Sequence, residues 1–256
     1  MSALIIGLVV FGCVFGGALL GVFLRSRLPH HHMSEESKDS IKVGMGLVGT
    51  MAALVLGLLV ASAKASYDAQ SAELTQMSAT AVLLDRGLAV YGPETKEARE
   101  LLHRVAVRML EENWSRDGGG TRSARSAAAE SLFAIIQGLS PKNDLQRSLQ
   151  SQALSMLVEI GKTRWLMYEQ GTTSISMPML VLLVLWLTAI FISFGLFAPS
   201  NVTVIASLFV SALSVSGAIY LILEMYAPYT GLIRISSAPL QAAIAQARPV
   251  VGGGLS

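Results

Sequence analysis

The residues best suited to chemistry are three consecutive histidines, His30, His31 and His32, followed by the carboxylates Glu35 and Glu36. Imidazole and carboxylate groups are both zinc ligands. Three adjacent side chains point in different directions on any regular element, so they cannot all reach one ion. We therefore predict a surface loop that gains positive charge at low pH rather than a metal site. The sequence contains no serine-nucleophile motif, no HExxH and no phosphate loop, which predicts a protein that is not an enzyme and binds no cofactor.

A second pattern consists of glycines inside apolar stretches. Gly12 and Gly16, and Gly17 and Gly21, are spaced four residues apart, and the stretch 43–63 is also rich in small residues, namely Gly44, Gly46, Gly49, Thr50 and Gly57. Small residues let helices approach closely in lipid. They fit either close packing of the first two helices within one chain, or a subunit interface or narrow pore lining. The run GMGLVGT is not a nucleotide loop, because no strand precedes it and no lysine follows.

A polar stripe lies in the last apolar stretch, where Ser207, Ser211 and Ser214 recur at helical spacing. Such side chains either bond to their own or a neighbouring helix, which we favour, or wet a pore. No Asp, Glu, Lys, Arg or His lies inside any apolar stretch, and Glu224 sits at the edge of the last one. This argues against a proton-coupled transporter and leaves a channel open.

The composition fits a membrane protein. Only 14% of the 256 residues are charged and 52% are hydrophobic, whereas a soluble domain carries about 25% charged residues. The net charge of +2 gives no electrostatic footprint for nucleic acid. A single cysteine excludes an intrachain disulfide framework and any multi-cysteine metal site.

Four uncharged blocks at 3–24, 43–63, 177–198 and 202–223 are each long enough to cross a hydrocarbon core of about 30 Å as a helix. We expect the first to be retained rather than cleaved, because no basic residue precedes it and Arg25 and Arg27 follow it. The fold class is therefore all-α, with four transmembrane helices and an extramembrane helical bundle inserted between the second and third. The predicted segments are a first helix pair at 1–63, the insert at 64–174, a second hairpin at 175–224 and a tail at 225–256.

Two spans precede the insert and two follow it, and this even count places both termini and the insert on one side of the membrane. Aromatic residues near the block ends support this, since they gather on the insert side as an interfacial belt comprising Tyr67, Trp165, Tyr168, Tyr226 and Tyr229. Basic residues near the block ends do not decide the orientation, because they fall equally on the two sides: Arg25, Arg27, Lys38 and Lys42 against Lys64, Lys162, Arg164 and Arg234.

The insert shows helical periodicity throughout. A heptad-like seam of Tyr67, Leu74, Met77, Ala81, Leu84, Leu88 and Tyr91 continues the second block as one long helix, which Gly92 and Pro93 end. We favour intrachain packing for this seam over contact between copies. Further helices are predicted at 94–113, around 132–136, and from Ser140 as N-cap with Pro141 at the first position, the last running on towards the third block.

Several runs together carry a family resemblance: LPHHHMSEESKDSIKVGMGLVGTMAALVLGLLVASAKASYD, LLDRGLAVYGPE and LILEMYAPYTGLIRISSAPL. They resemble the uncharacterised bestrophin-like domain family of bacterial membrane proteins, over nearly the whole chain. The sequence differs in having Tyr226 where an aspartate is expected after LEM, and His30 where an acid is expected. The resemblance implies motif roles for Gly44, Gly46, Thr50, Asp85, Arg86, Gly92, Pro93, Gly231, Leu232, Ile233, Arg234, Ser236 and Pro239.

Bestrophins are pentameric anion channels, so the resemblance implies a homo-oligomer in the bacterial plasma membrane, with the insert and both termini cytoplasmic and small inorganic ions as partners besides the lipid bilayer. We expect the second block to line the axis. Arg234 would bind lipid phosphate, meet an anion, or pair with Asp85 or Glu224, and pairing is the interpretation we favour. The alternative function is a membrane-anchored scaffold or sensor whose insert binds a partner protein.

Overall fold

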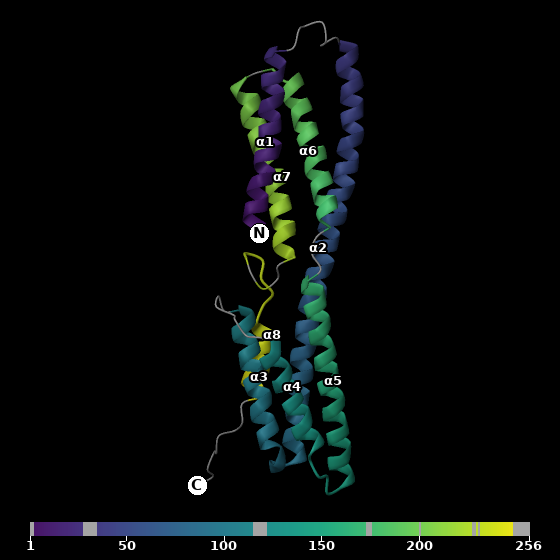
Figure 1. Ribbon diagram of the computed structural model, residues 1–256, viewed down its shortest axis with the longest axis vertical. Helices are drawn as coiled ribbons and strands as arrows, with labels where there is room; N and C mark the ends of the chain where they lie inside the picture. The colour runs from purple at the N-terminus through teal and green to yellow at the C-terminus, as the bar shows by residue number, and fades with distance from the viewer. Residues whose placement is uncertain are drawn as a thin grey trace. The chain divides into compact units, whose positions relative to one another are not determined.

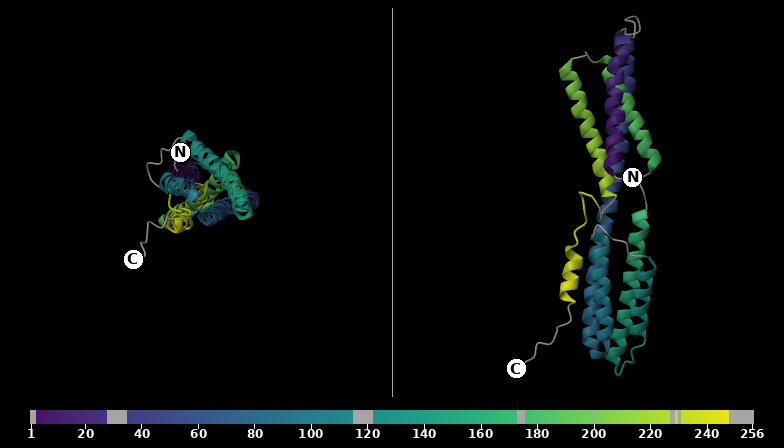
Figure 2. Two further views of the ribbon diagram at one scale, coloured as in Figure 1. Left: turned by 90° about the horizontal axis from the view of Figure 1, so that it is seen from below. Right: turned by 60° about the vertical axis from the view of Figure 1, so that its left-hand side comes forward.

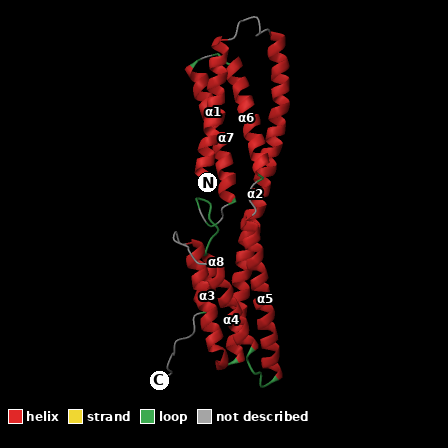
Figure 3. Ribbon diagram, in the orientation of Figure 1, coloured by secondary structure: helices red, strands yellow, loops and turns green. Residues whose placement is uncertain are grey.

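The computed structural model describes residues 3–27, 35–114, 122–172, 176–199, 201–226, 229 and 231–247, and all regular structure in these ranges is helical (Figures 1, 2 and 3). The elements are α1 (Ala3–Arg27), α2 (Glu35–Tyr91), a short 3-10 turn η2 (Pro93–Thr95), α3 (Lys96–Trp114), α4 (Arg122–Gln137), α5 (Asp144–Thr172), α6 (Met177–Phe197), α7 (Val202–Met225) and α8 (Ala238–Gln246). Of these, α1, α2, α6 and α7 are long and apolar enough to span a membrane. The predicted all-α class with four such helices is confirmed.

The chain forms two compact units. The first consists of residues 1–66, 174–227 and 231–233, and the second of residues 67–173, 228–230 and 234–256. The first unit contains α1, α6, α7 and the amino-terminal part of α2, while the second contains the rest of α2 with α3, α4, α5 and α8. As predicted, α2 is one uninterrupted helix from the second apolar block to Tyr91.

Three glycines bring α1 and α6 into close contact. A Cβ on Gly21 would collide with the carbonyl oxygen of Ile192, and a Cβ on Gly195 would collide with that of Ala18. A Cβ on Gly17 would lie 2.9 Å from Cγ2 of Thr188. Close backbone approach favours helix association in lipid, because van der Waals packing contributes there in the absence of a hydrophobic driving force.

This contact corrects one of the two sequence alternatives for the glycines. The close intrachain packing expected between the first two helices is instead between α1 and α6. The glycines of α2 do not pack against their own chain: a Cβ on any of Gly44, Gly46, Gly49 and Gly57 would meet nothing within 4 Å. Residue spacing shows which residues share a helix face, but not which helix that face meets.

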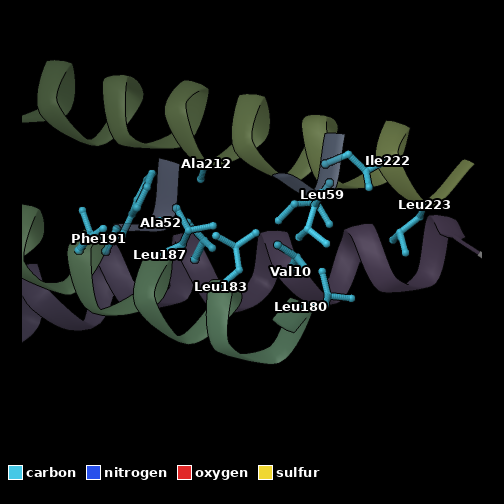
Figure 4. Close-up of a cluster of buried hydrophobic side chains, with 14 of the residues drawn as sticks. Val10, Ala52, Leu59, Leu180, Leu183, Leu187, Phe191, Ala212, Ile222 and Leu223 are labelled. Carbon is cyan, nitrogen blue, oxygen red and sulfur yellow. The ribbon is translucent and has the colours of Figure 1, made fainter. Parts of the chain in front are cut away.

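The core of the first unit lies between α1, α6 and α7, with α2 adding one face (Figure 4). Val14, Leu183 and Ile219 are among its most buried side chains. The contribution of α2 includes Ala52 and Leu59, which lie two turns apart on the same side of the helix. Aromatic rings support the α1–α7 contact, with Phe209 edge-on to both Phe11 and Phe15.

The core of the second unit contains the predicted seam of α2. Leu84 and Leu88 pack with Ala98, Leu102, Leu132, Ile136 and Ala153, and Leu74 and Met77 pack with Met167 and Ile235. Tyr91 is also buried, while Tyr67 and Ala81 are half-buried. The seam therefore lies in the core of its own chain, as the favoured interpretation predicted.

The start of α5 differs from the prediction. The helix begins at Asp144, and Asn143 rather than Ser140 caps it, because the Gln146 backbone N–H donates to Oδ1 of Asn143 at 2.8 Å. Oε1 of Gln146 accepts in return from the Lys142 backbone N–H at 2.8 Å. This reciprocal pair resembles a capping box, which satisfies two amide groups. The helix ends at Thr172, and α6 begins separately at Met177, with Pro178 in its first turn as expected.

We expect Gly21→Ala to lower the free energy of unfolding by about 1–3 kcal/mol, because overpacking a close contact forces the backbones apart. Unfolding in mixed micelles of increasing dodecyl sulfate content measures this. Gly12→Ala is the matched control, since its added Cβ would meet nothing within 4 Å. Equal stability of the two variants would contradict the close α1–α6 contact.

Candidate functional site

The first candidate site is the outer face of α2 in the first unit. Gly46, Thr50 and Gly57 are spaced four and seven residues apart, so they share one side of the helix, roughly opposite the buried Ala52 and Leu59. The flanking Val43 and Leu54 are 75% and 69% exposed in the isolated chain. This face consists of small and apolar residues that the chain itself leaves uncovered.

Of the three residues Gly46, Thr50 and Gly57, only Thr50 carries a side-chain hydroxyl. Its Oγ1 donates to the carbonyl oxygen of Leu47 at 2.7 Å. The hydroxyl proton is thus engaged within the helix, while the oxygen lone pairs point away from that bond. Thr50 therefore presents an acceptor to whatever lies beside α2.

The predicted serine stripe on α7 is also exposed. Ser207, Ser211 and Ser214 all lie on the surface of the first unit, and Ser214 donates to the carbonyl oxygen of Val210 at 2.9 Å. A serine that the sequence analysis did not single out, Ser216, is buried and donates to the carbonyl oxygen of Ala212 at 2.7 Å. Bonds back to the preceding turn are the usual way for a serine to be accommodated in an apolar helix.

The motif residue Asp85 forms a buried ion pair with Arg99. Nε and Nη2 of Arg99 donate to the two carboxylate oxygens at 2.8 and 2.9 Å. The carboxylate side chain is 6% exposed and the guanidinium side chain 25% exposed. The hydrogen bond to Asp85 raises the pKa of Arg99. Asp85 was one of the two acids expected to pair with Arg234, but its carboxylate is bound by Arg99, to which no sequence motif pointed.

The end of the run LLDRGLAVYGPE forms the chain reversal after α2. Gly92 has φ +137°, a backbone conformation that suits glycine. The buried Thr95 hydroxyl contacts the carbonyl oxygens of Leu88 at 2.5 Å and Gly92 at 2.8 Å. Nε2 of Gln146 donates to the carbonyl oxygen of Tyr91 at 2.9 Å. These contacts give the motif a structural role in the second unit.

Glu224 occupies the carboxyl end of α7, in the first unit, where it is buried. One of its carboxylate oxygens accepts from the Leu232 backbone N–H at 2.6 Å. Gly231 lies directly over this carboxylate at φ +87°, and a Cβ there would collide with it. Nearby, Tyr226 donates from its hydroxyl to Oγ of Ser62 on α2 at 3.1 Å. The motif glycine is thus required both by conformation and by space.

The residues from Arg234 to Gln246 form hydrogen bonds with other parts of the second unit. The Tyr67 hydroxyl donates to the carbonyl oxygen of Arg234 at 3.2 Å, and the Trp114 indole donates to that of Ile235 at 2.9 Å. Ser236 accepts from the Ala238 backbone N–H at 3.2 Å, where α8 begins with Pro239 in its first turn. At the other end of α8, the exposed Arg86 donates to Oε1 of Gln246 at 3.4 Å.

Tyr229 packs edge-on against Trp114, with ring centroids 5.4 Å apart. Burial, together with the negative charge of Glu73, raises the pKa of Tyr229 to about 12. The predicted aromatic residues Tyr67 and Tyr229 thus hold the segment after α7 against the second unit. The side chain of Tyr168 lies outside the described residues, and Trp165 is exposed.

Within the described ranges, no three His, Cys, Asp or Glu residues come together as a metal site would need. The histidines His30, His31 and His32 lie outside these ranges. Cys13 is a free thiol on the exposed side of α1.

We expect Asp85→Ala to destabilise the protein markedly, because it leaves Arg99 without its counter-charge. Removing one partner of a buried ion pair costs about 3–5 kcal/mol, and the partial exposure of Arg99 favours the lower end. Arg147→Ala is the control, since its pair with Asp144 is solvent-exposed and exposed pairs contribute about 0.2–1 kcal/mol. Denaturant unfolding measures both, and a similar small loss in each variant would contradict a structural role for Asp85.

We expect Tyr229→Phe to protect the protein at alkaline pH. A tyrosine ionises near pH 10 in an unfolded chain, whereas Tyr229 resists ionisation up to about pH 12 when folded. The stability associated with the raised pKa is complete below about pH 10 and is lost as the pH rises to about 12. Unfolding at pH 9 and at pH 11.5 should show a smaller loss of stability in the variant, and an identical loss in both proteins would refute the assignment.

A family model for the bestrophin-like domain matches residues 12–240. The match covers most of α1, all of α2, α6 and α7, and the segment that carries Gly231, Arg234, Ser236 and Pro239. No curated protein matches the chain. With four helices apolar enough to span a membrane and a match over most of its length, the chain is a membrane protein that belongs to the bestrophin-like family.

Proposed function

We propose that the protein is a homo-oligomeric channel for small inorganic anions and that the outer face of α2 lines its pore. The observation that carries this proposal is the uncovered small-residue face of Gly46, Thr50 and Gly57. A pore at a subunit axis needs several copies of one such face, related by symmetry. The preference for anions follows from the likeness of this family to bestrophins, which are anion channels.

The packing of the first unit supports this assignment of α2 over the other three spans. In α1, α6 and α7, 28%, 33% and 22% of the apolar window is buried within the chain, whereas only 11% of the window of α2 is buried. Large apolar side chains such as Val43, Leu47, Leu54 and Leu58 flank the small residues on its exposed surface. In an oligomer these side chains would contact neighbouring subunits, while the small residues would leave space along the axis.

The absence of charged residues from the apolar blocks is consistent with a channel. A proton-coupled transporter uses buried ionisable residues along its path. A channel constriction functions without them, because an apolar narrowing gates by controlling the entry of water. We assign no catalytic role to any residue of the chain.

The test is ion flux into liposomes that contain the purified protein, combined with measurement of its oligomeric state in nanodiscs. We expect Gly57→Leu to reduce anion flux at least about tenfold, because a bulky apolar side chain narrows and dewets a pore. Gly12→Leu is the matched control: both added side chains enter space that the chain leaves open, but Gly12 lies on α1. Equal flux in the two variants would exclude α2 as the pore helix.

Two further outcomes bear on the proposal. A ring of several subunits together with flux that Gly57→Leu reduces would support it. A monomer that shows no flux over a range of voltage and pH would overturn it.

The second candidate is a membrane-anchored scaffold or sensor whose second unit binds a partner protein. Its specific support is a pair of exposed apolar residues on α5, Val158 and Trp165, which are 61% and 66% exposed. They are seven residues apart and so share one face of the helix. If the protein is a scaffold, we expect no ion flux from the wild type. If it is a channel, we expect the Trp165→Ser variant to conduct ions like the wild type.

A further inference from the structure

Glu224 is a buried carboxylate at the carboxyl end of α7. Its side chain belongs to a residue that is 7% exposed, and the neighbouring Ile222 and Leu223 lie in the core of the first unit (Figure 4). Ionisable side chains within membrane-spanning helices are costly to bury, and they usually mark a functional site. The partners of Glu224 therefore show what its charge is used for.

The carboxylate binds the part of the chain that follows α7. One of its oxygens accepts from the Leu232 backbone N–H at 2.6 Å, and Gly231 lies so close that a Cβ there would collide with the carboxylate. The Tyr220 hydroxyl, one turn earlier on α7, interacts with the same carboxylate. Both partners offer hydrogen-bond donors, and an ionised carboxylate only accepts. The arrangement therefore fits the charged form of Glu224.

The surroundings of Glu224 provide no buried positive charge. No Lys or Arg is among the buried residues of the described ranges, and the two that are nearest along the adjoining segments, Lys64 and Arg234, are exposed. Residues 3–12 of α1 and the whole of α6 carry no titratable side chain. The Tyr226 hydroxyl donates to α2. Hydrogen-bond donors rather than a cation therefore hold this carboxylate in place.

The bound residues lead into a segment that covers apolar surface of the second unit. We name residues 231–246 the strap. Ile235 in the strap is 2% exposed and packs with Leu74 and Met167, and Leu240 on α8 is equally buried. Opening of the strap would expose this apolar surface to water.

We propose that Glu224 is an acid-sensitive clasp for the strap. When the carboxylate is charged, it holds the strap at Leu232; when it is protonated, the strap opens more often and exposes the surface beneath Ile235. A hydrogen bond to a charged acceptor is about twice as strong as one between neutral groups, and segments with few buried contacts open locally without unfolding the rest. The clasp does not depend on the proposed channel function.

The experiment measures how often the strap opens, using the full chain in phosphatidylcholine nanodiscs. Ile235→Cys places a buried reporter in the strap, and Cys13→Ser removes the natural thiol. A water-soluble maleimide then labels the reporter only when the strap opens. Each labelling rate is divided by that of Ala79→Cys, an exposed position on α2, so that the effect of pH on the thiol itself cancels. Leu240→Cys is a second buried reporter, for use if Ile235→Cys does not fold.

Glu224→Gln keeps the shape of the side chain and removes its charge. We expect it to raise the relative labelling rate of the reporter at least about tenfold at neutral pH, because a charge-assisted hydrogen bond is lost. Lowering the pH from about 7 to about 4, across the range in which a glutamate ordinarily gains its proton, should raise the rate when Glu224 is present but not in Glu224→Gln. Gly231→Ala should act like Glu224→Gln at neutral pH, since its Cβ displaces the carboxylate. Glu94→Gln, which removes an exposed carboxylate in the second unit, should change nothing.

A reporter at Ala153 distinguishes opening of the strap from unfolding of the second unit. Ala153 is buried in the other apolar cluster of that unit, away from Ile235. Equal acceleration of labelling at Ala153→Cys and at Ile235→Cys would assign the effect to unfolding and overturn the clasp. A rate at Ile235→Cys that Glu224→Gln leaves unchanged would also overturn it, and so would a rate that responds to Glu224→Gln but not to acid.

Discussion

The close contact between α1 and α6 is the interaction on which the first unit depends. Gly17, Gly21 and Gly195 let the two backbones meet, so that each helix occupies the space where the other would otherwise have a side chain. In lipid such contacts provide much of the association energy, because apolar side chains gain nothing by leaving one hydrocarbon environment for another. The helix α7 also packs against α1, where Phe209 lies edge-on to Phe11 and Phe15. The face of α2 that carries Gly46, Thr50 and Gly57 takes no part in this contact and is left uncovered by the chain.

The second unit is organised by polar contacts around an apolar core. Asp85 and Arg99 join α2 to α3 across the turn at Gly92. The segment after α7 binds through its backbone carbonyls to Tyr67 and Trp114. Bonds to backbone atoms make few demands on the side chains of the bound segment, but they require it to follow a fixed path. This explains why the motif after α7 includes a glycine with positive φ and a proline at the start of α8.

Much of the fold could be predicted from the sequence, because the signals are local. Uncharged blocks of about twenty residues predict the spans, and the seam from Leu74 to Leu88 predicts the buried face of α2. Gly92 and Pro93 end that helix because glycine allows the positive φ that is found there. The long helix follows from the absence of glycine and proline between Gly57 and Gly87.

Some features of the fold could not be predicted from the sequence. They depend on packing partners that are distant in the chain, or on competition between two local signals. The spacing of Gly17 and Gly21 shows a close-packing face, but α6 and α2 are equally plausible partners by spacing alone. Ser140 with Pro141 and Asn143 with Gln146 both resemble helix starts, and the second is used because each of its side chains satisfies a backbone amide. Arg234 was one of the partners expected for Asp85, whereas Arg99 binds its carboxylate across the turn.

The chemistry of the α2 face limits how the proposed channel discriminates between ions. Thr50 uses its hydroxyl proton within the helix, so it offers an acceptor and no donor to an anion. The glycines and apolar residues beside it offer no strong donor either. An anion would therefore keep most of its hydration shell along this face, and the cost of losing the rest would be lowest for large, weakly hydrated anions. Selection by dehydration cost rather than by a built binding site is the mechanism that this lining supports, and it needs no charged residue within the membrane.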